Sequence, residues 1–478
     1  MGGQEEGPRE AFIAGAWRET ASRFPVVSPV DGTVVAEVSD CGPAEAHAAI
    51  AAAEVASGPW AAATAYERAQ VLRRWFEAIG RHREDLARTM AREMGKPVSE
   101  GRAEVDYAAG FVEWYAEEAK RVYGTVVPSQ FAGKRLWVRP EPVGIVYGIT
   151  PWNFPAAMVT RKAAPALAAG CPFILKPAEE SPLTALWLAR LWEEAGGPPG
   201  TLQVLPARDP EALSRPFFED ARVRKLTFTG STAVGRALYA QAAPTLKHVS
   251  LELGGQAPFL VFEDADIPRA VEEAMRAKFR NIGQSCVAAN RLYVHRAVAA
   301  EFVRAYTARV QALKTGDPLA EDTQVGPLVN RQALEKVAAH VADALQRGAT
   351  LVTGGAAQGL IYLPTVLTGV DPASRILHEE TFGPVAPVVV FDQEEEAVAW
   401  ANATEYGLAA YLWTRDLGRA FRVAEALRYG IVGVNDGVPS TPQAPFGGVK
   451  QSGLGREGGR WGIEEFLEPK YISLHLPD

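Results

Sequence analysis

Four short stretches contain side chains that could take part in covalent or acid–base chemistry. Cys286 in "GQSC" is one of three cysteines in 478 residues, and a thiolate is a strong nucleophile. Asn153 in "TPWNFP" could donate its amide to an oxyanion, and Glu252 in "VSLELGG" could serve as a general base. In "FTGSTAVG", Gly230 and Ser231 stand where backbone N–H groups could approach a phosphate.

Each stretch also has a simpler interpretation when it is taken alone. A cysteine is often a buried, inert thiol, and Asn153 is an equally good N-cap for the apolar helix predicted after it. A strand glutamate such as Glu252 is normally partly exposed and solvated, and a strand–turn–helix junction with one glycine is usually ordinary turn chemistry. The chemical interpretation therefore requires that the fold bring the four stretches together.

The pattern of strands and helices predicts such a meeting. Short strand-like runs over 11–40 precede helical periodicity over 65–122. From residue 143, apolar strands alternate with helices in two series, which meet near Gly254 and end near residue 435. The predicted helices of these series include 154–169, 182–195 and 268–281. Such alternation predicts parallel sheets covered on both faces, which bind ligands at the carboxyl ends of their strands.

Composition favours a globular protein of two or three domains. The chain is 47% hydrophobic and 22% charged, and its formal net charge of -8 argues against a nucleic-acid scaffold or a basic membrane-surface protein. A signal peptide and a bilayer-spanning apolar stretch are not recognisable, so we expect a cytoplasmic protein without a membrane role. Cys41, Cys171 and Cys286 are far apart and lack CxxC spacing, which indicates free thiols and no metal site.

Six motifs in a fixed order give the chain a resemblance to a known family. They are "TPWNFP", "FTGST", "LELGG", "GQSC", "EETFGPV" at 379–385 and "PFGGVKQSGLGRE" at 445–457. Over nearly its whole length the chain resembles the aldehyde dehydrogenase superfamily, and it is most similar to succinate semialdehyde dehydrogenases. The resemblance implies an α/β fold with a Rossmann-type parallel-sheet cofactor domain, a second α/β catalytic domain and a small oligomerisation β element.

The resemblance also implies a division of the chain. An NAD-binding domain would comprise 1–122 and 142–253, and a catalytic domain would comprise 254–435. Residues 123–141 and 463–478 would be oligomerisation strands, and 436–462 would return to the cofactor domain with substrate-site residues. The expected assembly is a homodimer or homotetramer.

The catalytic roles implied by the resemblance make chemical sense. Cys286 would attack the aldehyde carbon, while the Asn153 amide and the Cys286 backbone N–H would stabilise the oxyanion. Glu252 would activate the water that hydrolyses the resulting thioester. Lys162 and Glu457 match a pair proposed to relay the proton away, although a surface ion pair is the alternative for either one.

The implied cofactor is NAD, with NADP less favoured. The residues that match cofactor-binding positions are Trp152, Lys176, Glu179, Gly230, Ser231, Leu253, Glu380 and Phe382. Of these, Lys176 and Glu179 match the positions that meet the adenosine ribose. A carboxylate there accepts a hydrogen bond from a 2′-hydroxyl but repels a 2′-phosphate, so Glu179 favours NAD.

Three residues match positions that hold the distal carboxylate in succinate semialdehyde dehydrogenases: Arg161, Arg280 and Ser440. Arg161 lies eight residues after Asn153, about two helical turns, so both are expected to face one tunnel. Taken singly, either arginine is a common surface or ion-pair residue. Succinate semialdehyde is the leading substrate, and glutarate semialdehyde or a broad range of aldehydes are alternatives. An esterase that uses the same thiol and a catalytically silent structural protein on this fold are further alternatives.

Overall fold

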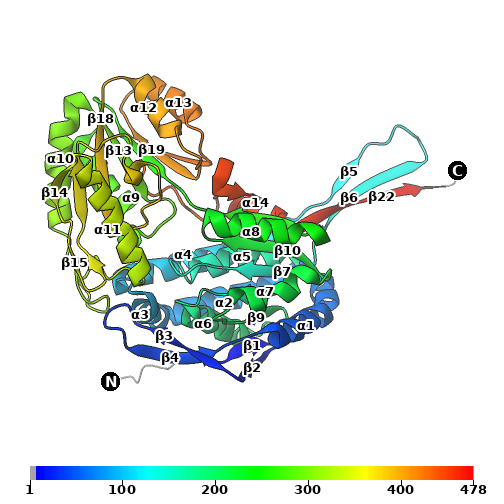
Figure 1. The fold of residues 1–478 in the computed structure, drawn as a ribbon. Helices are drawn as coiled ribbons and strands as arrows, with labels where there is room; N and C mark the ends of the chain where they lie inside the picture. The colour runs from blue at the N-terminus through cyan, green and yellow to red at the C-terminus, as the bar shows by residue number, and fades with distance from the viewer. Residues whose placement is uncertain (1–6, 477–478) are drawn as a thin grey trace.

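The computed structural model describes residues 7–476. The first six residues of the predicted cofactor domain and the last two of the predicted C-terminal strand lie outside the described residues. Within 7–476, no helix is long and apolar enough to cross a membrane. Two α/β bodies and a projecting β arm make up this part of the chain (Figure 1).

The first body is built on an eight-stranded sheet with the order β2-β1-β9-β8-β7-β10-β11-β21. Its strands are β1 (Ala11–Ile13), β2 (Ala16–Arg18), β7 (Ile145–Ile149), β8 (Phe173–Lys176), β9 (Leu202–Val204), β10 (Val223–Thr229), β11 (His248–Glu252) and β21 (Gly453–Leu454). The five central strands from β9 to β11 are parallel, and the flanking strands β1 and β21 pair antiparallel with them. The predicted parallel sheet is confirmed at its centre.

Helices cover both faces of this sheet. The helices of the first body are α1 (Pro43–Ala62), α2 (Ala65–Arg81), α3 (Arg83–Met94), α4 (Val98–Glu118), α5 (Ala157–Ala169), α6 (Pro182–Glu194), α7 (Pro210–Glu219) and α8 (Thr232–Ala242). Val146 of β7 packs in a core with α2, α4, α5 and α6, whereas its neighbour Tyr147 packs in another with α1, α7 and α8. Successive strand side chains point to opposite faces, so both faces of this sheet are apolar.

The second body has a seven-stranded sheet with the order β14-β17-β18-β13-β12-β19-β20. Its strands are β12 (Ala257–Val261), β13 (Ala289–His295), β14 (Thr350–Thr353), β17 (Thr365–Thr368), β18 (Val385–Phe391), β19 (Ala409–Trp413) and β20 (Ile431–Val434). Its helices are α9 (Ile267–Phe279), α10 (Arg296–Gln311), α11 (Arg331–Gln346), α12 (Glu394–Asn402) and α13 (Leu417–Ala426). All its strand pairs are parallel except β14 with β17.

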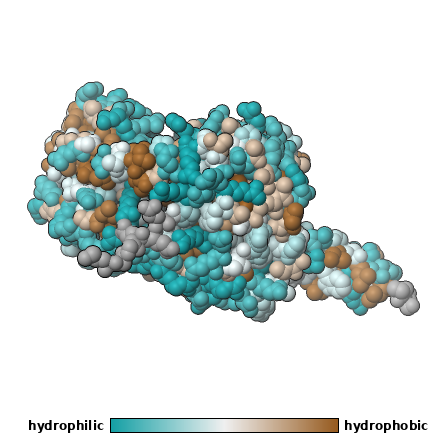
Figure 2. Space-filling model, turned by 90° about the horizontal axis from the view of Figure 1, so that it is seen from below, coloured by the Kyte–Doolittle hydropathy of each residue, from teal (hydrophilic) through white to brown (hydrophobic). Residues whose placement is uncertain are grey.

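A three-stranded arm of β5 (Thr125–Val127), β6 (Lys134–Pro142) and β22 (Leu467–His475) projects from the first body (Figure 1). The short helix α14 (Gly459–Glu464) precedes β22. Two small hairpins, β3 (Arg23–Val27) with β4 (Val34–Ser39) and β15 (Ala357–Gln358) with β16 (Ile361–Tyr362), complete the strands. Figure 2 shows hydrophobic atoms on the arm, where Val126 and Trp137 are exposed.

The described elements confirm most of the predicted ones and correct two expectations. The helix α1 was not predicted, because its buried residues apart from Ile50 and Trp60 are alanines and give little hydrophobic periodicity. The helix predicted over 154–169 begins only at Ala157. Asn153 therefore lies in the turn before the helix, and the argument that Arg161 follows it by two helical turns is wrong.

The parallel strands bring the four chemical stretches to one edge of the sheet. Ile149, the last residue of β7, lies opposite Lys176 and Phe228 of its two neighbours, and Thr229 of β10 lies opposite Glu252 of β11. The segments that follow these strands carry Asn153, Gly230 and the connection to the second body. Cys286 enters this edge from the other body, in the loop before β13.

Candidate active site

Cys286 lines a cavity of about 390 Å³ together with residues from both bodies. The thiol residue is partly exposed, whereas Cys41 and Cys171 are buried. The cavity also contains most of the residues that the sequence assigned to an active site and a cofactor: Trp152, Asn153, Gly230, Ser231, Leu253, Glu380 and Phe382. Cys286 lines this space, as the predicted nucleophile must, and its role stays a prediction.

The loop that carries Cys286 has an unusual backbone. Asn281, Ile282 and Gly283 all have positive φ, at 51°, 64° and 74°. For a β-branched residue such as Ile282 this conformation is strained and needs support from its surroundings. Glu100 supplies part of it by accepting a hydrogen bond from the Asn281 backbone N–H at 2.6 Å. Gly255 packs so closely on this loop that a Cβ there would lie 2.3 Å from the Cys286 carbonyl oxygen.

Asn153 is held in place through its own backbone. Lys96 Nζ donates to the Asn153 carbonyl oxygen at 2.8 Å, and the Asn281 side-chain amide donates to the same oxygen at 2.9 Å. The Asn153 amide donates to the Gln284 carbonyl oxygen at 3.0 Å. An amide nitrogen carries two protons, so one remains for a substrate oxygen. The alternative that Asn153 is an N-cap is not supported, because α5 has no side-chain cap and its N-cap residue is Ala156.

Lys96 and Glu104 form a buried ion pair behind Asn153, with both side chains 1% exposed. Glu104 also accepts hydrogen bonds from the backbone N–H groups of Ala156 and Ala157 at 2.9 and 3.2 Å. These N–H groups belong to the start of α5, where they have no partner within the helix. One carboxylate therefore fixes both the Lys96 ammonium and the helix that follows Asn153.

Glu252 is buried, contrary to the expectation for a partly exposed strand glutamate. Its Oε2 oxygen has no hydrogen-bond partner. The other carboxylate oxygen, Oε1, lies where a Cβ on Gly447 would come within 2.7 Å. Burial and then the charge of Glu457 raise the pKa of Glu252 well above its usual value, while the cations Arg161, Lys162 and Arg456 oppose this shift.

Lys162 and Glu457 form an ion pair that is buried, not on the surface. Lys162 pairs with Oε1 of Glu457 and lies 3.4 Å from the Thr227 hydroxyl. The Nε of Arg161 lies against Oε2 of the same carboxylate without the orientation of a hydrogen bond. Glu457 thus binds two adjacent cations of α5 and lies next to the general-base candidate Glu252.

The thiol of Cys286 is protonated at neutral pH in this environment. Burial and then the charge of Glu380 raise its pKa to about 12, and Arg161 opposes this shift. Burial also raises the pKa of Glu380 to about 7, although this carboxylate accepts a hydrogen bond from the Gly255 N–H at 2.9 Å. A reactive thiolate here requires that a neighbouring base accept the thiol proton.

The lining of the cavity has features that suit part of a dinucleotide. Trp152 and Phe382 form part of its wall, with ring centroids 5.6 Å apart and edge to face. Ser231 caps α8 by accepting from the Val234 N–H at 3.3 Å, so this helix directs its N-terminal dipole toward the cavity as a phosphate site requires. Ordinary helix capping therefore explains the residue type of Ser231 and remains compatible with phosphate binding.

The ribose-binding candidates lie beyond this cavity. Lys176 Nζ pairs with Glu179 at 2.7 Å, and Glu179 lines a neighbouring hollow that shares Glu180, Val329 and Asn330 with the first. A partly exposed carboxylate next to a buried ammonium suits a pair of ribose hydroxyls. Lys336 of α11 also lines the main cavity, and the sequence analysis missed it because nothing in its helical context distinguishes it from a solvated lysine.

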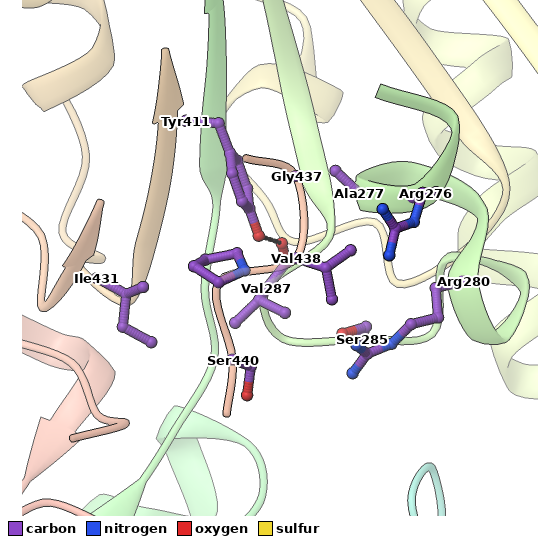
Figure 3. A pocket seen from close by; sticks show the side chains of 11 residues that line it. Arg276, Ala277, Arg280, Ser285, Val287, Tyr411, Ile431, Gly437, Val438 and Ser440 are labelled. Atoms are coloured by element: carbon purple, nitrogen blue, oxygen red, sulfur yellow. Dashed lines mark hydrogen bonds between the residues drawn. The ribbon is translucent and has the colours of Figure 1, made fainter. Parts of the chain in front are cut away.

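Arg280 and Ser440 line a second, smaller cavity, which also contains Ser285 and Val287 on either side of Cys286 (Figure 3). Arg280 lies over the Phe154 ring at 4.8 Å. The Ser440 hydroxyl lies 2.5 Å from that of Tyr107 on α4. Tyr411 and Arg276 complete part of the lining, and neither was singled out from the sequence.

Arg161 does not line this second cavity but is buried one layer behind it. Its guanidinium lies 3.9 Å from the Phe446 ring centroid and 5.4 Å from that of Phe111. The Phe111 ring in turn packs on Tyr107, the partner of Ser440, with centroids 5.0 Å apart. Arg161 is therefore joined by contact to Ser440, whereas Arg280 shares a cavity with Ser440.

Comparisons with known proteins show the family to which the chain belongs. The sequence profile of the Aldehyde dehydrogenase family matches residues 17–472. A succinate-semialdehyde dehydrogenase from Escherichia coli (strain K12), named for NADP(+), is 49% identical over 98% of each chain. A glutarate-semialdehyde dehydrogenase from Pseudomonas putida (strain KT2440) is 48% identical over 98% of each chain.

Solved structures show the same relation. The crystal structure of succinate-semialdehyde dehydrogenase from Burkholderia pseudomallei is 50% identical, with a TM-score of 0.97 over 98% of each chain. The predicted α/β fold of this family is thereby confirmed. Since both the profile and these relatives span almost the whole sequence, the chain belongs to the aldehyde dehydrogenase family.

Proposed function

We propose that this aldehyde dehydrogenase oxidises a short aldehyde with a distal carboxylate, with NAD as the preferred cofactor. The observation that carries this proposal is the second cavity, where Arg280 and Ser440 face the loop residues on either side of Cys286. A guanidinium and a hydroxyl in a narrow space suit the carboxylate of a substrate whose aldehyde reaches the thiol. Succinate semialdehyde is the leading candidate, and glutarate semialdehyde is one methylene longer.

Catalysis begins with the thiol of Cys286. Its sulfur attacks the aldehyde carbon as the thiol proton passes to a neighbouring base, for which the buried Glu252 is the candidate. The free proton of the Asn153 amide and the Cys286 backbone N–H stabilise the oxyanion. The bound nicotinamide cofactor supplies the hydride acceptor that turns this adduct into a thioester.

Hydrolysis of the thioester needs a base that is deprotonated while it faces the acyl group. Once the thiol proton has left Glu252 along Lys162 and Glu457, the carboxylate takes a proton from the attacking water, and the same pair leads this second proton away. The pKa of Glu252, raised by burial, makes it a stronger base than an exposed carboxylate. The same shift predicts that deacylation slows as the pH falls below that raised pKa.

The cofactor preference rests on Glu179. Its carboxylate stands beside Lys176 at the adenosine end, where a 2′-phosphate would add a second negative charge. The relative from Escherichia coli is named for NADP(+), so a preference for NAD would distinguish this chain from that relative. We also propose that the arm of β5, β6 and β22 joins copies of the chain in a homo-oligomer, since it carries exposed Val126 and Trp137.

The experiment that tests this function is an aldehyde panel measured with both cofactors. We expect kcat/KM for succinate or glutarate semialdehyde to exceed that for butanal or pentanal by about 100-fold, because a charged pair contributes about 3 kcal/mol. We also expect kcat/KM with NAD to exceed that with NADP. Equal rates for neutral and carboxylated aldehydes would support a broad-specificity enzyme instead, and ester cleavage without aldehyde oxidation would support an esterase.

A further inference from the structure

Arg161 has an arrangement that substrate binding alone does not explain. Its side chain is 2% exposed, and its Nε faces a carboxylate that is already paired with Lys162. Its Nη2 is buried and has no hydrogen-bond partner. A guanidinium has five donors in a rigid fork, so one edge can face Glu457 while the other faces a second anion.

The carboxylate that Arg161 faces belongs to the surroundings of Glu252. Four charged groups act on Glu252 from two segments: Arg161 and Lys162 on α5, and Glu457 and Arg456 between β21 and α14. The Cys286 thiol and the hydroxyls of Tyr107 and Tyr115 on α4 also act on this cluster. Two acids and three cations thus share one buried space, where screening by water is weak.

We propose that Arg161 is a positioning residue for deacylation, which connects a substrate carboxylate in the second cavity to Glu457 at its Nε and thereby to the base Glu252. The part that concerns the substrate carboxylate rests on the proposed function. The part that concerns Glu457 and Glu252 does not, because it depends on the ion pairs of Glu457 and on the charges that act on Glu252, all within the chain. No covalent step is added to the reaction.

The direction of the effect follows from the signs of the charges. Arg161 lowers the pKa of Glu252, and Glu457 raises it. A substrate carboxylate in the second cavity, one layer from the guanidinium, offsets part of the positive charge of Arg161, so the pKa of Glu252 rises. Deacylation of a carboxylated acyl group is then carried out by a stronger base than deacylation of a neutral one.

The test measures deacylation directly and uses a neutral aldehyde, so that no substrate carboxylate takes part. The acyl-enzyme is formed from butanal with excess NAD in a first mixing step. It is then mixed into buffers from pH 5 to 9, and release of butanoate is followed by rapid quench. The rate constant falls on the acid side as Glu252 is protonated, and the midpoint of this fall is the quantity compared.

Arg161→Gln removes a cation that favours the ionised form of Glu252, so we expect its midpoint to move to higher pH by about 1 unit. Arg161→Lys keeps the charge and should return the midpoint to within about 0.3 unit of the unmodified enzyme. Arg280→Gln removes a cation that lies against Phe154 instead, and its midpoint should move less than half as far. An unmoved midpoint in Arg161→Gln, or an equal shift in Arg161→Lys, would overturn the proposal.

Two further measurements of the deacylation midpoint test the proposal independently. Glu457→Gln removes the charge that raises the pKa of Glu252, so its midpoint should move to lower pH, opposite to Arg161→Gln. This variant carries the test if Arg161→Gln does not fold, and a move to higher pH would contradict the proposal. In the unmodified enzyme, the midpoint with succinate semialdehyde should lie above that with butanal, and equal midpoints would overturn the coupling.

These results are distinguishable from failure of the proposed function. If the enzyme does not prefer carboxylated aldehydes but Arg161→Gln still shifts the butanal midpoint, the substrate class is wrong and the link from Arg161 to Glu252 stands. If carboxylated aldehydes are preferred but the butanal midpoint does not move, the proposed function stands and this inference falls.

Discussion

Two buried ion pairs flank the site, and they differ in how completely their polar atoms are satisfied. Lys96 and Glu104 pair with each other. Lys96 also donates to the Asn153 carbonyl and lies 4.0 Å from the Phe154 ring centroid, and Glu104 accepts from the start of α5. The cluster of Arg161, Lys162 and Glu457 leaves Arg161 Nη2 without a partner, and the nearby Glu252 Oε2 is also unpartnered.

We infer from this difference that Lys96 and Glu104 hold the site in place, whereas the cluster of Arg161, Lys162 and Glu457 takes part in the reaction. Buried polar atoms are almost always hydrogen-bonded in folded proteins, so unpartnered ones call for a functional reason. The unpartnered atoms near Glu252 suit a water molecule and a carboxylate, and the proposed reaction would bring both. The backbone carbonyl of Asn153 accepts two hydrogen bonds, as expected for a support whose geometry has to stay fixed.

Breaking the satisfied pair is the change with the largest expected effect. Lys96→Met leaves Glu104 as an uncompensated buried charge, and we expect the free energy of unfolding to fall by about 3–5 kcal/mol. Urea denaturation measures this loss. The double variant Lys96→Met with Glu104→Gln removes both charges while the amide oxygen still accepts from Ala156, so it should recover much of the stability. A single variant as stable as the unmodified protein would show that the pair is not a support.

The reactivity of the Cys286 thiol shows whether burial or nearby positive charge has the larger effect on its pKa. Because burial raises the pKa of Cys286 to about 12 and outweighs the charge of Arg161, the thiolate fraction should grow about tenfold per pH unit, or about 100-fold from pH 7 to 9. Alkylation by iodoacetamide, followed by mass spectrometry of the cofactor-free protein, measures this rate. Buried Cys41 and Cys171 serve as internal controls that stay unmodified. A rate that reaches a plateau below pH 8 would mean that the positive charges dominate.

Breaking the open cluster should cost less stability than breaking the satisfied pair. In Lys162→Met, Glu457 keeps Arg161 as a partner, so we expect a loss of about 1–2 kcal/mol. The deacylation rate should fall about tenfold, less than the 10²–10⁴-fold contribution typical of a direct general base.

Lys225 of β10 provides the matched control for this change. It is also buried but pairs with Glu465 at 3.3 Å. Lys225→Met should lower stability to a similar extent and leave deacylation within about twofold of the unmodified enzyme. If both variants slow deacylation equally, the effect of Lys162 is structural and not part of a proton path.

The smallest expected effect concerns a third pair, which is partly exposed. Glu179 is 43% exposed beside Lys176, so Glu179→Ser should change stability by less than about 1 kcal/mol. Its effect should appear in cofactor choice, with the ratio of kcat/KM for NADP to that for NAD rising about fivefold, which corresponds to about 1 kcal/mol. Kinetics with both cofactors at fixed aldehyde measure it, and better use of NADP by the unmodified enzyme would refute the assignment.

Much of the fold was predictable because the hydrophobic periodicity of each strand or helix lies within a short stretch of sequence. The apolar strands β7, β8, β10 and β11 and the helices α5, α6 and α9 stand where alternation placed them, with boundary errors of a few residues. The helix α1 was missed for want of large apolar residues. The roles of individual site residues and the division into domains stay predictions, although the cavity contains Cys286, Asn153 and six cofactor candidates.

The sequence by itself determined which candidate reacting groups the chain contains, and it predicted the edge of the sheet where they meet. Residue types are local facts, and parallel strands place their carboxyl ends together by topology. Only the tertiary structure decided that Glu252 is buried, that Lys162 and Arg161 share Glu457, and that Lys96 supports Asn153. The Lys162 and Glu457 positions are 295 residues apart, and no local pattern encodes a contact of that span. Burial and long-range charge set the pKa values of these groups, and both arise only when distant segments pack together.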